Sequence, residues 1–174
     1  GKYYRQVLEK IPDYTNALVG MGNIYFLTVN DYKTAISYYN QVLDLDPLQP
    51  VALFGKGASL HRLKRYAEYD AVFDFMLENQ AYHLGEAYYY KAYNQFHQGN
   101  FIAARRLVNK GKRLLPRSGE VLYLSGLLYF KEKKMDLAFN DFYDCLYDRF
   151  YSPCFPLHYI GVIRAKQQNW KFLD

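Results

Sequence analysis

Apolar residues recur along this chain with two periods at once, one short and one long. The short period is visible at Leu18, Met21 and Tyr25, which stand at i, i+3 and i+7 and therefore share one face of a helix. No alternation of apolar and polar residues is long enough to predict a strand. The pattern therefore predicts an all-α chain.

The long period, of 34 or 35 residues, appears in several series of positions that keep the same phase. Small residues recur at Gly22, Gly57, Ala92, Gly126 and Gly161. Large residues recur at Tyr32, Tyr66, Phe101, Met135 and Trp170, and a third series runs through Val7, Val42, Met76, Gly111 and Cys145. A fixed period of this length is typical of helical repeat arrays, so we expect one supersecondary unit to be repeated along the chain.

Each repeat is expected to contain two helices joined by a short turn. The expected turns are Asn30-Asp31, Gly99-Asn100 and Gln168-Asn169. Pro47 marks the end of a second helix, because proline has no N–H to continue one. Glycine costs about 1 kcal/mol inside a helix, so the glycines of the small-residue series predict a close approach of two backbones.

These positions resemble the tetratricopeptide repeat, whose signature combines a large residue, Leu-Gly, Tyr, Ala, an aromatic residue and Pro. The first full unit carries it through Leu18, Met21, Gly22, Tyr25, Ala35, Tyr39 and Pro47. The third carries Tyr88, Ala92, Ala104 and Pro116, and the fourth carries Leu122, Gly126, Tyr129, Ala138 and Phe142. The second departs from the signature, with Lys56 before Gly57 and Tyr69 in place of the alanine.

The resemblance implies helix–turn–helix repeats of 34–35 residues stacked into a right-handed superhelical solenoid. We expect residues 1–174 to form a single solenoid with a half unit at 1–14, full units at 15–49, 50–84, 85–118 and 119–152, and a partial unit at 153–174. A natural solenoid has polar caps, and neither end shows one. The chain is therefore interpreted as a fragment of a longer array whose uncapped ends, Tyr3 to Leu8 and Trp170 to Leu173, self-associate.

The residues that could carry chemistry do not form a reactive or metal-binding pattern. None of the four histidines makes a two-histidine motif with a carboxylate. Cys145 belongs to a core series, and Cys154 lies in the segment Ser152–Pro156 without a positioned base. The glycines sit inside helices and form no phosphate loop. We therefore expect no enzyme activity, no metal and no cofactor.

Charge is organised by unit. The second helix of the third unit is basic, with Arg105, Arg106, Lys110, Lys112, Arg113 and Arg117, whereas its neighbours carry Glu68, Asp70, Asp74 and Glu78, and Asp136, Asp141, Asp144 and Asp148. Complementary charge between stacked helices is the favoured interpretation, and nucleic-acid binding through residues 105–117 is the alternative. Acidic neighbours would cancel the field of a basic stripe, so we expect no nucleic-acid partner.

The first helix of each unit has a second apolar stripe, opposite the face that packs against the second helix. A helix that is apolar on both faces needs a second surface for burial. In the repeat family this stripe lines a concave groove that holds partners. The candidate groove residues are Val19, Asn23, Phe26, Phe54, His61, Tyr89, Tyr93, Phe96, Tyr123, Leu127, Phe130 and His158.

The expected function is a protein–protein interaction scaffold that binds a peptide or helix of another protein through apolar or aromatic anchors. The alternatives are that neighbouring helices bury the stripe without any ligand, and that the repeats build an assembly with each other or with a second copy. No run of 18 apolar residues predicts a membrane span. The sequence names no compartment, so a cytoplasmic location is the default.

Overall fold

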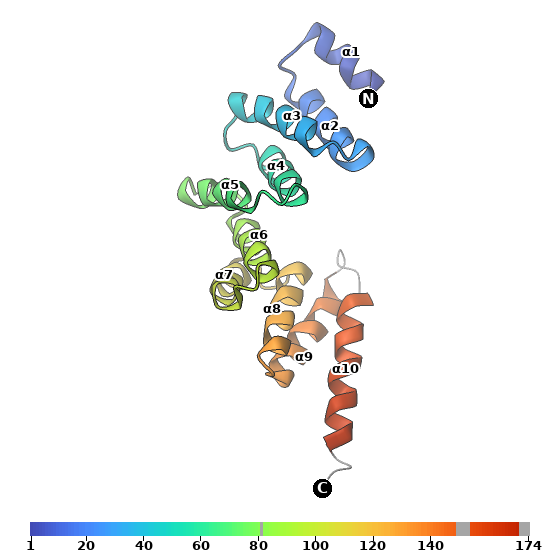
Figure 1. Cartoon of the computed structure of the whole chain (residues 1–174), viewed down its shortest axis with the longest axis vertical. Coiled ribbons are helices and arrows are strands. Elements are labelled where there is room, and N and C mark those ends of the chain that lie inside the picture. The colour runs from blue at the N-terminus through green and yellow to red at the C-terminus, as the bar shows by residue number, and fades with distance from the viewer. Residues whose placement is uncertain (81, 149–153, 171–174) are drawn as a thin grey trace. The chain divides into compact units, whose positions relative to one another are not determined.

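The computed structural model describes residues 1–80, 82–148 and 154–170, and within them every regular element is helical (Figure 1). The α-helices are α1 (Lys2–Lys10), α2 (Thr15–Ile24), α3 (Tyr32–Leu45), α4 (Pro50–Arg62), α5 (Tyr66–Glu78), α6 (Leu84–His97), α7 (Phe101–Leu114), α8 (Gly119–Lys131), α9 (Met135–Asp144) and α10 (Cys154–Trp170). A π-helical turn, η1 (Tyr25–Val29), extends α2, and a 3-10 turn, η2 (Cys145–Tyr147), extends α9. The predicted all-α class is confirmed.

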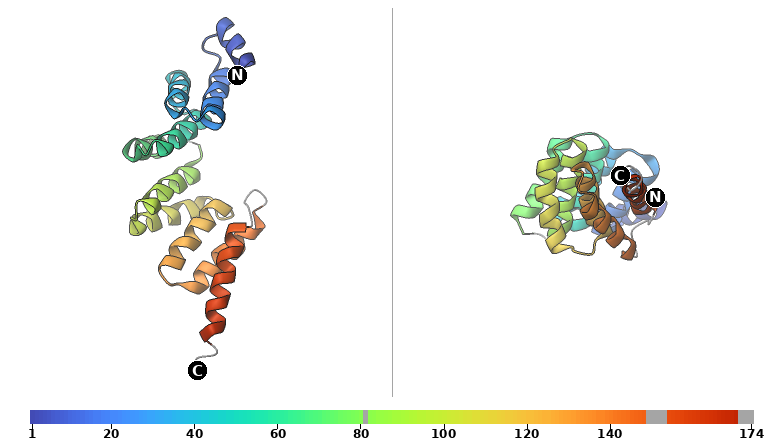
Figure 2. Two further views of the ribbon diagram at one scale, coloured as in Figure 1. Left: turned by 45° about the vertical axis from the view of Figure 1, so that its right-hand side comes forward. Right: turned by 90° about the horizontal axis from the view of Figure 1, so that it is seen from below.

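The helices fall into two compact units, unit 1 at Gly1–His83 and unit 2 at Leu84–Asp174. Unit 1 holds α1 to α5, and unit 2 holds α6 to α10. Within each unit, helices that follow one another in the chain lie side by side, as the left-hand view of Figure 2 shows. None of the described helices is both long and apolar enough to cross a membrane.

The turns inside the hairpins share one backbone conformation. Asn30, Lys64, Gly99 and Lys133 each have φ between 58° and 82°, in the left-handed region that ends helices. They follow one another in steps of 34 or 35 residues. The turns predicted at Asn30-Asp31 and Gly99-Asn100 are therefore present.

The turn predicted at Gln168-Asn169 is wrong. Gln168 stands 35 residues after Lys133, at the phase of the left-handed turn residues, yet α10 continues through it to Trp170. Glutamine is a good helix former, but so is lysine, which adopts the left-handed turn conformation at Lys64 and Lys133, so residue type at this phase does not decide between turn and helix. The second helix predicted to begin at Trp170 would run through Phe172 and Leu173, which lie outside the described residues.

Polar side chains begin several of the helices. The carboxylate of Asp31 accepts a hydrogen bond from the backbone N–H of Thr34 at 3.1 Å and another from the Thr34 hydroxyl at 2.6 Å, which lowers the pKa of Asp31. Gln49 and Ser118 accept from the N–H groups of Ala52 and Val121 at the starts of α4 and α8. Each cap satisfies a backbone donor that has no partner within its helix.

Aromatic rings, and not a second backbone, occupy the space beside the repeated glycines. A Cβ atom added at Gly22 would lie 2.6 Å from the ring of Tyr39, and one added at Gly57 or Gly126 would lie 2.8 or 2.6 Å from Phe73 or Phe142. Each ring comes from the second helix of the same hairpin. The predicted approach of two backbones is therefore wrong for these glycines, although Gly111 does meet the carbonyl oxygen of Gly85.

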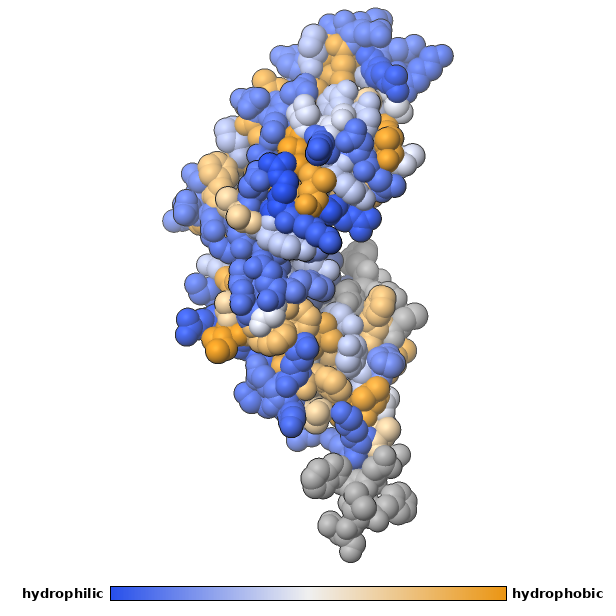
Figure 3. Space-filling view, viewed as in Figure 1, coloured by the Kyte–Doolittle hydropathy of each residue, from blue (hydrophilic) through white to orange (hydrophobic). Residues whose placement is uncertain are grey.

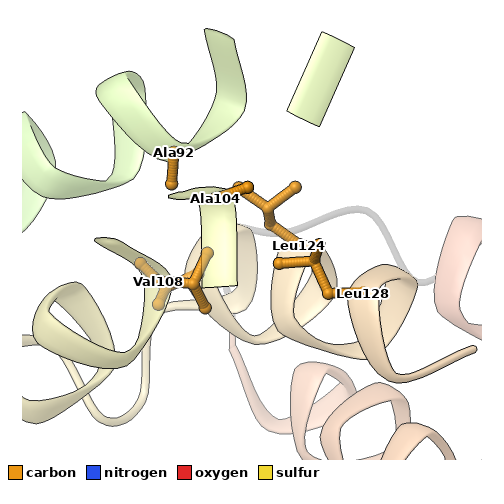
Figure 4. Close-up of a cluster of buried hydrophobic side chains, with 6 residues drawn as sticks. Ala92, Ala104, Val108, Leu124 and Leu128 are labelled. Carbon is orange, nitrogen blue, oxygen red and sulfur yellow. The ribbon is translucent and has the colours of Figure 1, made fainter. Parts of the chain in front are cut away.

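The core consists of clusters that join each hairpin to the next. In unit 1, the cluster contains Leu18, Ala35, Tyr39, Val42 and Ala52. In unit 2, one cluster contains Ala92, Ala104, Val108, Val121, Leu124 and Leu128 (Figure 4), and another contains Ala138, Phe142 and Ile163. The small-residue series supplies Ala92 and the third series supplies Val42 to these clusters.

The second repeat, which departs from the family signature, is packed in its own way. Tyr69 replaces the usual alanine and is only 2% exposed. Its ring centroid lies 4.8 Å from that of Phe73 and 5.6 Å from that of His61. The core of this hairpin accommodates the larger residue by packing rings together.

Candidate functional site

The predicted groove residues of unit 1 are already engaged within that unit. Val19 and Phe26 are partly buried against the core that contains Tyr39. The side-chain oxygen of Asn23 accepts a hydrogen bond of 2.8 Å from the Tyr39 hydroxyl. The ring of Phe54 lies 6.1 Å from that of Phe73. Much of the stripe in this unit therefore supports the hairpins themselves.

In unit 2, the stripe of α6 carries three rings that are half-buried. Tyr89, Tyr93 and Phe96 pack against the cluster formed by α6, α7 and α8. The rings of Tyr89 and Tyr93 lie 6.1 Å apart, and the ring of Phe96 lies 5.5 Å from that of Phe101. Their burial is incomplete, so part of each ring still faces solvent.

The stripe of α8 meets α10. Tyr123, Leu127 and Phe130 are partly buried beside Ile163, and the ring of Tyr159 lies 6.1 Å from Tyr123 and 5.3 Å from Phe130. Burial, together with the nearby Tyr159, raises the pKa of Tyr123 to about 12. His158 is exposed beside Tyr159 and does not line the pocket described below.

A pocket of about 820 Å³ opens at one end of these stripes. It brings together three of the predicted groove residues, Phe96, Leu127 and Phe130. The remaining lining residues, which sequence reasoning missed, are Lys131, Lys133, Met135, Tyr159, Lys166 and Gln167. Figure 3 shows apolar patches set among hydrophilic residues on the visible face.

Two of the lysines hold their ammonium groups over the rings. The Lys131 nitrogen lies 4.8 Å from the ring centroid of Phe101 and 5.8 Å from that of Phe96. The Lys166 nitrogen lies 5.1 Å from the ring centroid of Phe130. A cation over an aromatic face is attracted by the negative charge of that face. These contacts keep positive charge at the edge of an apolar pocket.

A repeat signal in the sequence could have revealed these lysines. Arg62, His97, Lys131 and Lys166 follow one another in steps of 35, 34 and 35, and the first three each stand one residue after the last predicted groove residue of their helix. Arg62 is placed like the lysines, since its guanidinium lies 5.5 Å from the ring of Tyr32. Hydrophobic periodicity does not reveal this series, because its members are polar.

The basic helix α7 divides into two faces. Arg105 donates to Glu132 at 3.0 Å and stacks 3.8 Å from the ring of Tyr129, and Lys112 pairs with the buried carboxylate of Asp141 on α9. The interpretation of complementary charge between stacked second helices holds for Lys112 and not for Arg105, because Glu132 follows the first helix α8. Three others, Arg106, Lys110 and Arg113, line a second pocket of about 650 Å³ between α6 and α7.

The described residues contain no cluster of three or more histidine, cysteine, aspartate or glutamate side chains that could hold a metal ion. Cys145 is buried, and its sulfur lies within hydrogen-bond distance of two backbone oxygens, those of Asp141 at 3.2 Å and Gly119 at 3.4 Å, either of which can accept its single S–H. Burial, reinforced by Asp141 and two other carboxylates, raises the pKa of Cys145 to about 12. A thiol with such a pKa is a poor nucleophile. The side chain of Cys154 lies outside the described residues.

Residues 24–68 match the family model of the tetratricopeptide repeat. No curated protein matches the chain. A tetratricopeptide repeat protein of Parabacteroides merdae superposes with a TM-score of 0.75 at 17% identity, covering 92% of this chain and 62% of that one. The chain thus spans less than two thirds of that protein.

Two further solved structures are similar in fold. The hetero-tetramer Cut9-Hcn1 of the APC/C matches with a TM-score of 0.72 and 19% identity, over 83% of this chain and 27% of that one. YrrB, a tetratricopeptide repeat protein with an unusual peptide-binding site, matches with a TM-score of 0.64 and 18% identity, over 95% of this chain and 84% of that one. At such low identity, these likenesses show the fold alone.

Proposed function

We propose that this chain is a member of the tetratricopeptide repeat family and a scaffold that binds a segment of another protein along the first-helix stripe of unit 2. The family generally serves protein–protein interaction or assembly. The single observation that carries the finer proposal is the pocket that joins Phe96 of α6, Leu127 and Phe130 of α8, and Tyr159 of α10.

The half-buried rings suit a binding surface. Each ring that leaves water on binding could contribute up to about 1.5–3 kcal/mol. Tyrosine adds a hydroxyl that can fix the register of the bound segment. YrrB, which has the same fold, has a peptide-binding site, and this supports a peptide or helix as the occupant.

The test is to capture partners with the intact protein, identify them by mass spectrometry, and measure the binding of a purified partner by calorimetry. The variant Tyr93→Ala, Phe96→Ala should weaken that binding by about 30-fold, the effect of a hot spot worth about 2 kcal/mol. Ile102→Ala, Tyr147→Ala is the matched control, since both residues are exposed in unit 2 and lie off the stripe.

The fold of both variants is checked by circular dichroism and thermal melting. We expect the stripe variant to lose affinity with little change in melting temperature. A folded stripe variant that binds as tightly as the control would remove the stripe from the site. Unfolding of the stripe variant alone would show that the rings serve the core.

A second candidate function is assembly with another copy, and Gly161 favours it. The equivalent glycines Gly22 and Gly126 lie under rings of a second helix, whereas a Cβ atom added at Gly161 would have no described atom within 4 Å. Leu157, one helical turn earlier, is 50% exposed. This face of α10 could receive a second helix from a neighbouring molecule. Concentration-dependent sedimentation that Gly161→Arg abolishes would support assembly, whereas a monomer at all concentrations would exclude it.

A further inference from the structure

We infer that the pocket of unit 2 selects a partner segment in which carboxylates flank an apolar side chain. This inference rests on the proposed function, because it specifies the chemistry of the segment that the stripe binds. It follows from three features of the pocket: its apolar floor, its cationic rim and the absence of acidic residues from its described lining.

The floor is large and apolar. Phe96, Leu127, Phe130, Met135 and Tyr159 come from three successive first helices and the start of α9. A volume of about 820 Å³ lies within the range of pockets that enclose a small ligand. One large apolar or aromatic side chain of a partner segment would therefore be enclosed, with its flanking residues at the rim.

The rim carries three lysines, Lys131, Lys133 and Lys166, all of them exposed. Their ammonium groups form no ion pair with any described residue. Two acidic residues stand close by in the sequence: Glu132 pairs with Arg105 and Lys134, and Asp136 accepts a hydrogen bond from Gln167, which lines the pocket. The three rim lysines thus outnumber the one carboxylate, that of Asp136, which contacts a described lining residue and forms no ion pair with a described residue, and the rim keeps a net positive charge.

The lysine contacts also decide where that charge sits. Lys131 and Lys166 rest over Phe101, Phe96 and Phe130, so their nitrogens stay at the edge of the floor. A carboxylate beside the enclosed side chain of the partner, the anchor, would meet an ammonium group that is already in position. The lysine side chain then loses less conformational entropy when the ion pair forms. Glutamate or aspartate on either side of the anchor is the matching chemistry.

A single-stranded nucleic acid fits this pocket less well than an acidic peptide. Bases bind such proteins by stacking on free aromatic faces. Lysine heads lie over one face each of Phe96 and Phe130, so the floor can take one enclosed side chain but does not offer the row of free faces that successive bases need. A phosphate chain would also find no arginine among the described lining residues to hold it by two parallel hydrogen bonds.

The experiment uses fluorescent peptides that differ only beside a central tryptophan, with glutamates, glutamines or lysines as the flanking residues. Binding to the intact chain is measured by fluorescence anisotropy. We expect the glutamate peptide to bind about tenfold more tightly than the glutamine peptide, as several exposed ion pairs acting together would produce. This preference should shrink as salt is raised from about 0.05 M to about 0.5 M, because salt screens exposed charges.

The charge-reversal variant Lys131→Glu, Lys166→Glu should lose the preference for the glutamate peptide and bind the lysine peptide instead. The matched control is Lys2→Glu, Lys10→Glu, which changes the net charge equally on the exposed face of α1. If the reversal impairs folding, Lys131→Gln, Lys166→Gln removes the same charges without adding new ones and should abolish the preference for glutamate.

Equal affinity for the glutamate and glutamine peptides would overturn the inference, as would charge variants that bind the glutamate peptide like the control. Tighter binding of an oligothymidylate probe than of the glutamate peptide would overturn it in favour of nucleic acid. The proposed function fails separately, because Tyr93→Ala, Phe96→Ala should weaken the glutamate and glutamine peptides alike. If that variant weakens binding while the charges have no effect, the stripe remains the site and the acidic preference is wrong.

Discussion

The hairpins α2–α3 of unit 1 and α6–α7 of unit 2 differ in the size of the residues that they place at equivalent core positions. In unit 1, the ring of Tyr39 on α3 lies between Gly22 of α2 and Gly55 of α4, where an added Cβ would stand 2.6 and 2.4 Å from ring atoms. In unit 2, the position of Tyr39 is taken by Val108, and the position of Gly55 is taken by Leu124. Both replacements are buried in one cluster (Figure 4).

The difference shows how one repeat pattern tolerates different cores. In unit 2 a smaller residue on the second helix, Val108, is accompanied by a larger one on the next first helix, Leu124, so the two exchanges offset each other in part. Cores accept such compensated exchanges much better than single changes of volume. In unit 2 the rings stand on the stripe of α6, at Tyr89, Tyr93 and Phe96, whereas in unit 1 the stripe residue Asn23 is bound to the core ring itself. The half-buried aromatic rings of the α6 stripe therefore have no counterpart at Asn23 of unit 1.

The largest expected effect comes from moving the core of unit 2 into unit 1. Gly55→Leu alone collides with the ring of Tyr39, and Tyr39→Val alone leaves a cavity, so each should cost about 3 kcal/mol. The double variant should cost less than the sum by about 2 kcal/mol, because the two residues share one space. Chemical denaturation and hydrogen exchange of α3 and α4 measure both quantities. Strictly additive costs would refute the idea of a compensated exchange.

The next effect concerns the polar contact that ties α7 to α9 in unit 2. Lys112→Met would leave the carboxylate of Asp141, whose side chain is 6% exposed, without its cation. We expect the free energy of unfolding to fall by about 2 kcal/mol. This is less than for a fully buried ion pair, because Lys112 is itself one third exposed. Adding Asp141→Leu should restore most of the loss. Arg65→Met, which breaks the exposed pair with Glu68 in unit 1, is the control and should leave the melting temperature unchanged.

Tyr39→Phe tests the polar anchor of unit 1, which Val108 lacks in unit 2. The substitution removes the hydroxyl that donates to Asn23 and should cost about 1 kcal/mol near neutral pH. Burial raises the pKa of Tyr39 from 10.0 to about 12, so the unfolded chain ionises first. The contribution of the Tyr39 hydroxyl to the free energy of unfolding is therefore complete below pH 10 and is lost as the pH rises toward 12. Alkaline melting curves should converge for the two proteins, and parallel curves would contradict the assignment.

The smallest effect is expected at Glu120 of α8, whose counterpart in unit 1 is Val51 of α4. Burial and the nearby carboxylates of Asp148 and Glu86 raise the pKa of Glu120. Because the pKa of Glu120 is higher in the folded chain than in the unfolded chain, its contribution to stability is complete below the pKa of the unfolded chain. That contribution falls as the pH rises through the pKa of the folded chain. Glu120→Gln should therefore raise the melting temperature slightly at pH 7 and not at acidic pH. An equal change at both pH values would assign the effect to packing.

Hydrophobic periodicity predicts the helices well here because one phase of every repeat faces a neighbouring helix. Cys145 and Met76 belong to one series for that reason, and both are buried. The same guide misreads Gly22, since a missing Cβ leaves room for a ring as readily as for a backbone. The structure distinguishes a neighbouring ring from a neighbouring backbone, because it shows the ring of Tyr39 beside Gly22. The turn at Gln168 fails because the left-handed conformation seen at Lys64 and Lys133 is not encoded by residue type.

The candidate site could be predicted only in part. Phe96, Leu127 and Phe130 follow from the stripe, and the pocket does unite them. Val19 and Asn23 share the same phase, yet the hairpins of unit 1 use them internally. Phase locates a residue on a helix face but does not say what covers that face. That depends on side-chain volumes in the next repeat.

The exchange between Tyr39–Gly55 and Val108–Leu124 also bears on how such chains can be recombined. If a segment were cut between hairpins and joined to a foreign one, Tyr39 could meet a leucine, or Val108 a glycine, and the junction would be overfilled or hollow. A cut at the turn inside a hairpin, near Asn30 or Gly99, keeps each of these pairs on one fragment, but the cut near Asn30 separates Tyr39 from Gly22 and Asn23 of α2. In unit 1, a cut on either side of α3 therefore breaks a contact of Tyr39, and a recombined chain has to match residue volumes at whichever junction it creates.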